Sequence, residues 1–494
     1  MNTLAKGGFN QLLLLLLFLL VTVGKSGFWI MPNLQEQFMI SQSLLHNPLP
    51  APESHYLLTN YLQPMLFGWT GGGSLKAYAW YALGTTVLFY VGFVLWYVRR
   101  RRISPGSSSS LLAVGVFTVF VTPAYWIGMD GATLLLLFLT MVFLYSRWSI
   151  LFAVLLAWQH FEHGLVGFLL LAGTLVIMAA RGNAPVHLAA LRRTGVVLLA
   201  LFAGKGLLLV FFRLAHLQPA VDLPTLLGTE FPENFRAWTG NWPAILFSLF
   251  GTGWLLLLIR ARKIWPIFPA VLAAFLFLML VQDKTRTGTL ILFPVIMYAL
   301  CLNPAFWDFL TPKWLCVLLV VHLVTPTCFF WQQVNGGLWH HSPEIVTRLF
   351  KPGASFDDFD GWKPFTQDRF APTVYTATDL SSSTGQMENG DVVSQPGRPG
   401  LLTDGPMAPL SKGAYLARIY YSTDPGPTGQ VVGNWDVERA ATPRVIQQGN
   451  LLSGYHRIAI LLFACDRDQD VAIRTYSLGR QRISIDRIEV QQLY

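Results

Sequence analysis

Long apolar runs alternate with short basic or polar segments through the first 335 residues. A helix needs about 20 mainly apolar residues to cross a bilayer, and runs near this length predict eleven transmembrane segments. The predicted segments are 9–30, 76–98, 110–128, 131–147, 148–160, 164–181, 195–214, 242–260, 264–282, 287–303 and 313–333. Several are short, so tilted or re-entrant segments fit the same pattern. The first run resembles a signal peptide, but no convincing cleavage site follows it, so we expect an uncleaved segment.

A different pattern begins near Gly353, where short stretches of alternating apolar and polar residues are separated by glycine-containing turns. Such alternation is typical of strands in an all-β domain. The predicted strands include 414–421, 456–463, 471–476 and 482–490, whereas 381–412 is rich in Ser, Gly and Pro and predicts a loop. The chain is therefore predicted to be a polytopic α-helical membrane domain, 1–335, followed by a β-sandwich domain, 345–494.

The composition supports the membrane prediction. Charged residues make up only 12% of the 494 residues, about half of the usual share in soluble domains. The formal charge of +9 does not point to nucleic acid, because many of the basic residues lie where cytoplasmic loops are expected. Four cysteines without a regular spacing imply no disulfide framework.

Basic clusters recur in alternate loops of the predicted segments and set the orientation. The clusters are 99–102, Arg147, Arg181 with 192–193, 260–263 and Lys313. By the positive-inside rule these loops are cytoplasmic, which places the N-terminus inside. An odd number of segments then places the β domain outside. We expect a multi-pass protein of a bacterial inner membrane, with its C-terminal domain periplasmic or extracellular.

The same topology gathers the carboxylates on the outer side. Eight of the nine that precede residue 311 fall there. They are Glu36, Glu53, Asp130, Glu162, Asp222, Glu230, Glu233 and Asp283, and Asp308 is the exception. A charged side chain at a helix centre costs about 2.5–3.5 kcal/mol by insertion scales. Acids collected on one side of an apolar bundle therefore suggest a functional site that faces away from the cytoplasm.

The first outer loop contains two amphipathic stretches, 33–45 and 55–67, separated by prolines. Gln35-Glu36, a small polar turn and the Pro-containing segment that follows resemble the first loop of the GT-C superfamily, polytopic glycosyltransferases that use lipid-phosphate-linked sugars. The resemblance implies an acidic pair at this place, often Asp-Glu. This chain has Gln in the first position, so Glu36 becomes the catalytic candidate, since a carboxylate at the membrane surface can deprotonate an acceptor hydroxyl. A solvated charge on an amphipathic helix is the alternative. Glu53 and His55 are substrate-binding candidates.

Asp130 lies between Gly128 and Gly131, at the outer end of the fourth predicted segment. We predict either a second catalytic carboxylate or an N-cap for the helix that follows, a role that Asp fills well. Both roles are compatible with the sequence.

His160, Glu162 and His163 form a polar patch at the outer end of the fifth segment. These residue types can bind metal, but their spacing is not a metal signature, so substrate binding is the preferred interpretation and an interfacial turn the alternative. Lys205, between two glycines in the seventh segment, is a charge within the membrane and hence a further functional candidate.

Residues 282–287, Gln-Asp-Lys-Thr-Arg-Thr, precede an apolar stretch that contains Pro294. This arrangement resembles the late GT-C motif in which a basic residue at the outer face meets the lipid phosphate. Lys284 and Arg286 could each form charge-assisted bonds to phosphate oxygens. Asp283 is a neighbouring binding candidate, and the competing interpretation is a simple Asp283–Arg286 ion pair.

In the C-terminal domain, residues 404–415 resemble a turn of jelly-roll carbohydrate-binding modules. Trp362, Tyr375, Trp435 and Tyr476 could stack on sugar faces, although core packing is the simpler role for each of them.

Together the resemblances imply an inverting glycosyltransferase. It would move a sugar from a polyprenyl-phosphate donor to a glycan or lipid acceptor outside the cytoplasm. A surface-polysaccharide polymerase or ligase and a transporter are the alternatives; a transporter would show internal repeats and broken helices, and no repeat is evident. Cofactor use is left open, with a divalent metal such as Mg or Mn as one candidate.

Overall fold

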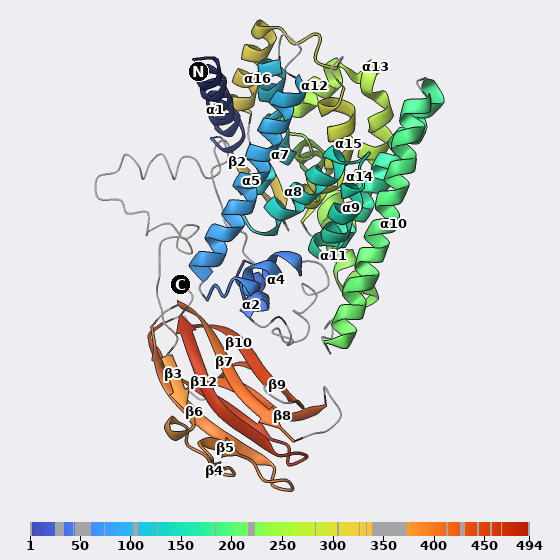
Figure 1. The fold of residues 1–494 in the computed structure, drawn as a ribbon. Coiled ribbons are helices and arrows are strands. Elements are labelled where there is room, and N and C mark those ends of the chain that lie inside the picture. Colours follow the sequence, from blue (N-terminus) through green and yellow to red (C-terminus); the bar gives the residue numbers. More distant parts are fainter. Residues whose placement is uncertain are drawn as a thin grey trace, which may run out of the picture.

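The computed structural model comprises a helical region and an antiparallel β domain (Figure 1). The residues that it describes are 2–24, 34–42, 44, 61–73, 75–101, 107–125, 127–182, 184–215, 223–281, 283–303, 306–325, 327–331, 333–337, 373–411, 413–424, 430–441, 444–454, 457–465 and 467–492.

Helices account for nearly all of the described chain up to residue 324. They are α1 (Asn2–Val23), α2 (Leu34–Gln42), α4 (Leu62–Trp69), α5 (Leu75–Arg101), α6 (Ser107–Val114), α7 (Thr118–Tyr125), α8 (Met129–Val142), α9 (Trp148–Arg181), α10 (Ala184–Leu214), α11 (Leu223–Ser248), α12 (Gly253–Ile259), α13 (Ala261–Ile264), α14 (Phe268–Phe277), α15 (Lys284–Ile296) and α16 (Pro312–Val324). A 3₁₀ turn, η2 (Trp265–Ile267), precedes α14, and a π-helical turn, η3 (Met297–Cys301), follows α15.

Three of these helices, α5, α9 and α10, are long and apolar enough to cross a membrane. A fourth span would come from Asn234–Ser248 and Gly253–Ile259, which meet at an angle of 77°. Such helices indicate membrane insertion, but the predicted eleven spans are not confirmed. Many of the predicted segments are interrupted: 110–128, for example, contains two short helices, α6 and α7, separated by a turn at 115–117.

The last predicted segment, 313–333, is wrong in its second half. Helix α16 ends at Val324, and Thr325 has an extended backbone. Strands β1 (Thr327–Trp331) and β2 (Gln333–Gly337) then pair as an antiparallel hairpin. The residue before a proline is disfavoured in the helical region, and Pro326 follows Thr325 in the sequence. The apolar run therefore continues as a strand.

Helix α9 consists of two helical pieces joined at His160, whose φ of −164° and ψ of 83° are not helical. A Cβ on Gly164 would lie 2.9 Å from a side-chain atom of Leu156. In an unbroken helix eight residues correspond to about 12 Å of rise, so the chain bends sharply here. The break lies between the predicted fifth and sixth segments, where the sequence places a turn.

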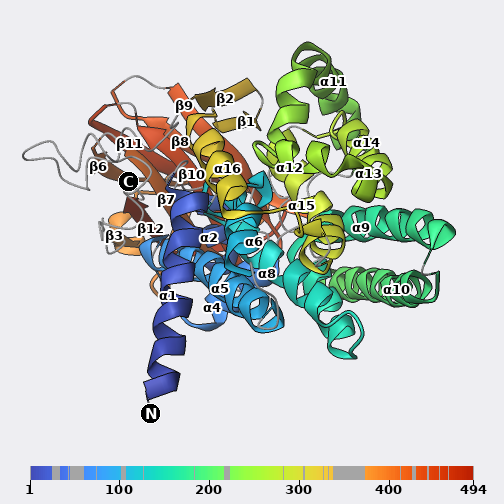
Figure 2. The same cartoon turned by 90° about the horizontal axis from the view of Figure 1, so that it is seen from above.

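Helix α15 is the centre of the helical region. Each of its residues is buried, as expected for a helix surrounded by others. It packs against α7, α8, α9 and α14. Seen from above, α9 and α10 lie side by side at one edge of the bundle (Figure 2). Side chains on α15 are therefore held from several directions.

The β domain is a sandwich of two antiparallel sheets. Its strands are β3 (Thr373–Thr376), β4 (Gln386–Glu388), β5 (Asp391–Val393), β6 (Gly400–Leu410), β7 (Gly413–Thr423), β8 (Val431–Arg439), β9 (Arg444–Leu452), β10 (Arg457–Cys465), β11 (Gln469–Ser477) and β12 (Ile483–Gln492). One sheet has the order β10-β7-β12-β5-β4, with β3 also paired to β12, and the other β6-β11-β8-β9. Alternate residues such as Ile419, Val437 and Ile473 form the core between them.

The four strands predicted from the sequence are confirmed as β7, β10, β11 and β12, but the predicted loop at 381–412 is wrong. It contains β4, β5 and the eleven-residue strand β6. Strand β6 carries Pro406 and Pro409, which lack the N–H that a central strand must donate. Because β6 lies at the edge of its sheet, the prolines are tolerated there.

The β domain lies next to α2 and α4, and the N-terminus and α13 lie at the far end of the helical region (Figure 1). Leu416 of β7 and Ile458 of β10 pack with the helical core rather than with the sandwich core. The outer face of the β10-β7-β12 sheet is thus the face that meets the helices.

Candidate functional site

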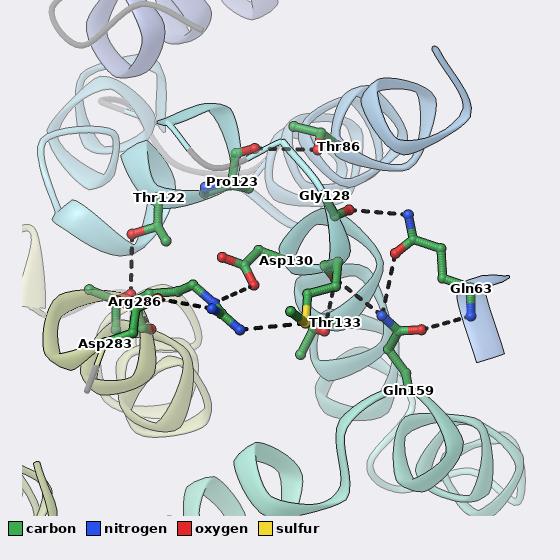
Figure 3. A network of polar contacts seen from close by, with 12 residues as sticks. Gln63, Thr86, Thr122, Pro123, Gly128, Asp130, Thr133, Gln159, Asp283 and Arg286 are labelled. Atoms are coloured by element: carbon green, nitrogen blue, oxygen red, sulfur yellow. Dashed lines mark hydrogen bonds and ion pairs between the residues drawn. The ribbon is translucent and has the colours of Figure 1, made fainter. Parts of the chain in front are cut away.

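A buried ion-pair network joins α8 to α15. Arg286 Nε donates to Asp130 Oδ1 at 2.9 Å, and Arg286 Nη1 donates to Asp283 Oδ2 at 2.9 Å (Figure 3). The Asp130 side chain is 0% exposed and that of Arg286 is 10% exposed. The predicted alternative for Asp283, an ion pair with Arg286, is present. The same guanidinium also holds Asp130, a contact across 156 residues.

In each carboxylate of this network only one oxygen accepts a hydrogen bond from Arg286. Asp130 Oδ2 and Asp283 Oδ1 are buried and have no hydrogen-bond partner among the described residues. Leaving a buried acceptor unsatisfied costs about 1–3 kcal/mol, and more when the group is charged. Each unsatisfied group in a native structure therefore calls for an explanation, such as a bound substrate or a catalytic role. Asp130 is positioned to accept a proton or a hydrogen bond at Oδ2.

Asp130 is not the N-cap of α8, so that alternative is wrong. The N-cap is Gly128, and Asp130 lies in the first helical turn, where the helix dipole favours a negative charge. Gly131 allows this turn to approach α5 closely: a Cβ there would lie 2.3 Å from Thr86 Oγ1 and 2.8 Å from the Thr86 backbone. Gly131 thus lets the turn that carries Asp130 pack directly against α5.

Lys284, the first residue of α15, is fully buried. Its ammonium donates to the carbonyl of Val281 at 2.7 Å and to that of Leu278 at 3.3 Å. Leu278 is the C-cap of α14, so Lys284 binds carbonyl groups at a helix end, a favourable place for a cation. The structure brings Lys284 and Arg286 onto one helix but directs them to different partners.

Hydroxyl groups hold α15 in register with its neighbours. Thr285 and Ser248 of α11 share a hydrogen bond of 2.7 Å, and Thr289 shares one of 3.1 Å with Thr122 of α7. All four side chains are buried. These bonds link α15 to α11 and α7 on either side of Arg286 in the sequence.

The predicted patch at His160, Glu162 and His163 lies at the break in α9. The two imidazoles stack with ring centroids 3.5 Å apart. Lys205 of α10 lies 3.4 Å from Glu162 and 5.3 Å from the ring centroid of Phe161. The charge predicted within the seventh segment is therefore paired. Because α9 packs on both α8 and α15, the patch and the Asp130–Arg286 pair lie in the same part of the bundle.

Gln63 and Gln159 form an amide cluster that the sequence did not reveal. Gln63 Nε2 donates to the Gly128 carbonyl at 3.1 Å, and Gln159 Nε2 donates to the Met129 carbonyl at 3.2 Å (Figure 3). The Gln63 backbone N–H donates to Gln159 Oε1 at 3.0 Å. Both side chains are almost completely buried. The cluster ties the first loop, through α4, to the turn that carries Asp130.

Only a weak signal in the sequence could have identified these glutamines. Gln63 precedes Pro64 in an apolar stretch, and Gln159 precedes the His160–His163 patch. An uncharged polar residue in such surroundings needs hydrogen-bond partners when buried. The sequence does not say which partners these are.

Glu36 falls on α2, in agreement with the helix predicted there, but its side chain lies outside what the structure describes. Leu34 and Phe38 of α2 are buried, and Gln37 accepts a hydrogen bond from Tyr78 at 3.2 Å. Glu53, His55 and Asp222 are outside the described residues. Among the described residues, no three His, Cys, Asp or Glu side chains come together as metal ligands.

The aromatic candidates of the β domain divide by burial. Trp435 is 3% exposed and belongs to the sandwich core, so it cannot stack on a sugar. Tyr375 packs partly against the same core. Tyr476 donates to Asp436 Oδ2 at 3.1 Å, and burial together with that carboxylate raises the pKa of Tyr476 to about 12. Trp362 lies outside the described residues.

Comparison with protein-family models and with curated proteins finds no match for this chain.

Proposed function

We propose that the protein is a membrane glycosyltransferase that transfers a sugar from a polyprenyl-phosphate donor to a hydroxyl acceptor. The observation that carries the proposal is Asp130: a fully buried carboxylate with one oxygen bound to Arg286 and the other without a partner in the described chain. An arrangement of this kind suits a residue that accepts a proton from a substrate. The resemblance of the first loop and of residues 282–287 to GT-C motifs supplies the class of reaction.

In the proposed reaction the acceptor hydroxyl attacks the anomeric carbon and forms the new glycosidic bond. The bond between that carbon and the phosphate oxygen breaks, and the lipid phosphate leaves with the bonding electron pair. The hydroxyl proton passes to Asp130 Oδ2, while Arg286 keeps Oδ1 in place. Attack opposite the leaving group inverts the anomeric configuration. Glu36, on the first-loop helix, is retained as the second candidate base.

The test is sugar transfer from a polyprenyl-phosphate donor in membranes that contain the full chain. We expect Asp130→Asn to reduce transfer by roughly 10²–10⁴-fold, the range for loss of a general base, because an amide cannot accept the proton. Asp308→Asn is the matched control, since Asp308 is the acid predicted on the opposite side and should be dispensable. Full activity in the Asp130→Asn protein would exclude Asp130 as the base, and absence of any transfer by the wild-type chain with a range of donors would exclude the reaction.

One observation favours a transporter as the second candidate. Broken helices near buried charges are typical of transporters, and α9 is broken at His160 beside Glu162 and Lys205. The two functions predict different products. Uptake or release of an unmodified solute by proteoliposomes, without any new glycosidic bond, would favour transport.

A further inference from the structure

The stacked imidazoles of His160 and His163 are buried in the helical region without a full set of hydrogen-bond partners. Their residues are 8% and 5% exposed, and the Nδ1 atom of each ring has no hydrogen-bond partner among the described residues. Glu162 Oε2 approaches His160 Nδ1 only to 3.6 Å. Buried polar atoms normally find partners, so the two Nδ1 atoms are open to a further group that would bind them.

The break in α9 creates this pairing. His160 has an extended backbone, and the bend that follows brings its ring face to face with that of His163, at an interplanar angle of 21°. The helix is interrupted at the point where the imidazoles stack. The pair is therefore a product of the fold and not only of the spacing along the sequence.

The pair belongs to a network of charged groups carried by α8, α9, α10 and α15. The acids are Asp130 on α8, Glu162 on α9 and Asp283 at the N-cap of α15, and the cations are Lys205 on α10 with Lys284 and Arg286 on α15. Glu162 is paired with Lys205, and Arg286 with both Asp130 and Asp283. With Lys284 included, three acids and three cations balance, so the network is neutral when both rings are neutral. Arg286 and Lys205 lie near enough to act electrostatically on His160, and Arg286 acts also on His163.

The cations that the sequence offered for phosphate binding already have partners. The Lys284 ammonium donates to two carbonyls, and the Arg286 guanidinium bonds to two carboxylates. A phosphate entering this neutral cluster would need a further positive charge, since a buried charge must be paired. Histidine is the side chain that can gain a proton near neutral pH, and the cluster holds two.

We propose that the His160–His163 pair is an anion site for a phosphate group, and that phosphate binding is accompanied by proton uptake on the pair. The protonated ring donates to a phosphate oxygen, which supplies the missing partner. The chemistry recognised is that of a phosphate, on a prenyl chain or free in solution. That the phosphate belongs to the sugar donor rests on the proposed function, whereas the anion site itself does not.

Isothermal titration of the full-length protein in detergent tests the proposal directly. Farnesyl phosphate and inorganic phosphate are titrated near neutral pH in two buffers of different ionisation enthalpy. We expect the observed binding enthalpy to increase with the ionisation enthalpy of the buffer, which is the sign of proton uptake, and the affinity to fall as the pH rises. Tighter binding of farnesyl phosphate than of inorganic phosphate would identify a lipid phosphate; equal affinities would identify free phosphate as the ligand. Binding without any buffer dependence would overturn the proposal.

Variants then locate the proton. His160→Gln and His163→Gln should each weaken farnesyl phosphate binding roughly tenfold or more, the equivalent of one charge-assisted hydrogen bond, and reduce the proton uptake. His187→Gln is the control, because His187 is a histidine of α10 bound to Tyr298 and should change neither quantity. Loss of affinity in Lys284→Gln, with both histidine variants unaffected, would assign the phosphate to Lys284 instead.

The binding measurement requires neither sugar transfer nor folded variants, because proton uptake is read first in the wild-type protein. Phosphate binding with proton uptake but without sugar transfer would refute the proposed function and retain the anion site. Sugar transfer that depends on Asp130, with no proton uptake on donor binding, would refute the anion site and retain the function.

Discussion

The helical region and the β domain each contain an Asp–Arg ion pair, and the two pairs differ in how completely they are satisfied. In the β domain, Arg474 donates to both oxygens of Asp436 at 2.8 Å, and Tyr476 adds a third bond. In the helical region, Arg286 reaches only one oxygen of Asp130. The pair on the sheet is also more exposed, with side chains at 21% and 13% against 10% and 0%.

This comparison separates a structural ion pair from a candidate functional one. In a bidentate Arg–carboxylate pair both carboxylate oxygens are already bonded, so neither is free to bind a substrate. This arrangement suits a structural role in holding β8 to β11. A deeply buried carboxylate with an unpaired oxygen costs stability, and proteins accept such costs most often at functional sites. The helical pair is therefore the one to which we assign chemistry.

Removing the arginine should give the largest effect. Arg286→Met leaves Asp130 as an unpaired buried charge, and breaking a buried pair in this way costs about 3–5 kcal/mol. We expect a large fall in the thermal unfolding temperature in detergent, together with loss of transfer. The double variant Asp130→Asn, Arg286→Met should recover much of the stability but no activity. Equal stability of Arg286→Met and wild type would show that the pair is not buried as described.

Loss of the Gln63–Gln159 amide cluster should have the second largest effect on stability and transfer. Gln159→Leu removes the partners of the Met129 carbonyl and of the Gln63 backbone N–H, and each buried group left unsatisfied costs about 1–3 kcal/mol. We expect lower thermal stability and a fall in kcat larger than the rise in donor KM, because the turn that carries Asp130 shifts. Gln159→Glu keeps one of these bonds and should be intermediate. A wild-type kcat in the Gln159→Leu protein would contradict a role of Gln159 in positioning Asp130.

Gly131→Ala tests the close contact between α8 and α5. The added methyl group would overlap Thr86, and overpacking typically costs about 1–3 kcal/mol. Gly173→Ala is a suitable control, because a Cβ there would meet nothing within 4 Å. We expect reduced stability and transfer only for the Gly131 variant, measured by thermal unfolding and by the transfer assay; identical behaviour of the two variants would contradict the close approach.

The β-domain pair should give the smallest effect on function. Arg474→Met removes bonds to two partly exposed carboxylates, Asp436 and Glu438, for which about 1 kcal/mol or less each is expected after solvent screening. Transfer by the full chain should be unchanged, and unfolding should shift only slightly. A loss of transfer comparable to that of Arg286→Met would show that the β-domain pair is also needed for function.

Several elements of the site were predictable from residues alone. Asp130, Lys284, Arg286 and the His160–His163 patch were identified because polar groups in apolar surroundings require a reason. Helix α2 and the principal strands of the sandwich followed from their periodicity. The loop predicted at 381–412 failed because its prolines indicate a loop unless the strand lies at an edge, and edge position is a property of the whole sheet.

The sequence by itself determined the division into an apolar helical region and an alternating β domain, since both depend on local patterns of side chains. It also determined which charges lie in apolar surroundings. Only the tertiary structure decided their partners: that Arg286 bonds to Asp130, that Lys284 bonds to carbonyls, and that Gln63 meets Gln159. The reason is physical. A hydrogen bond is specified by positions within a few tenths of an ångström, and those positions arise from the packing of whole helices.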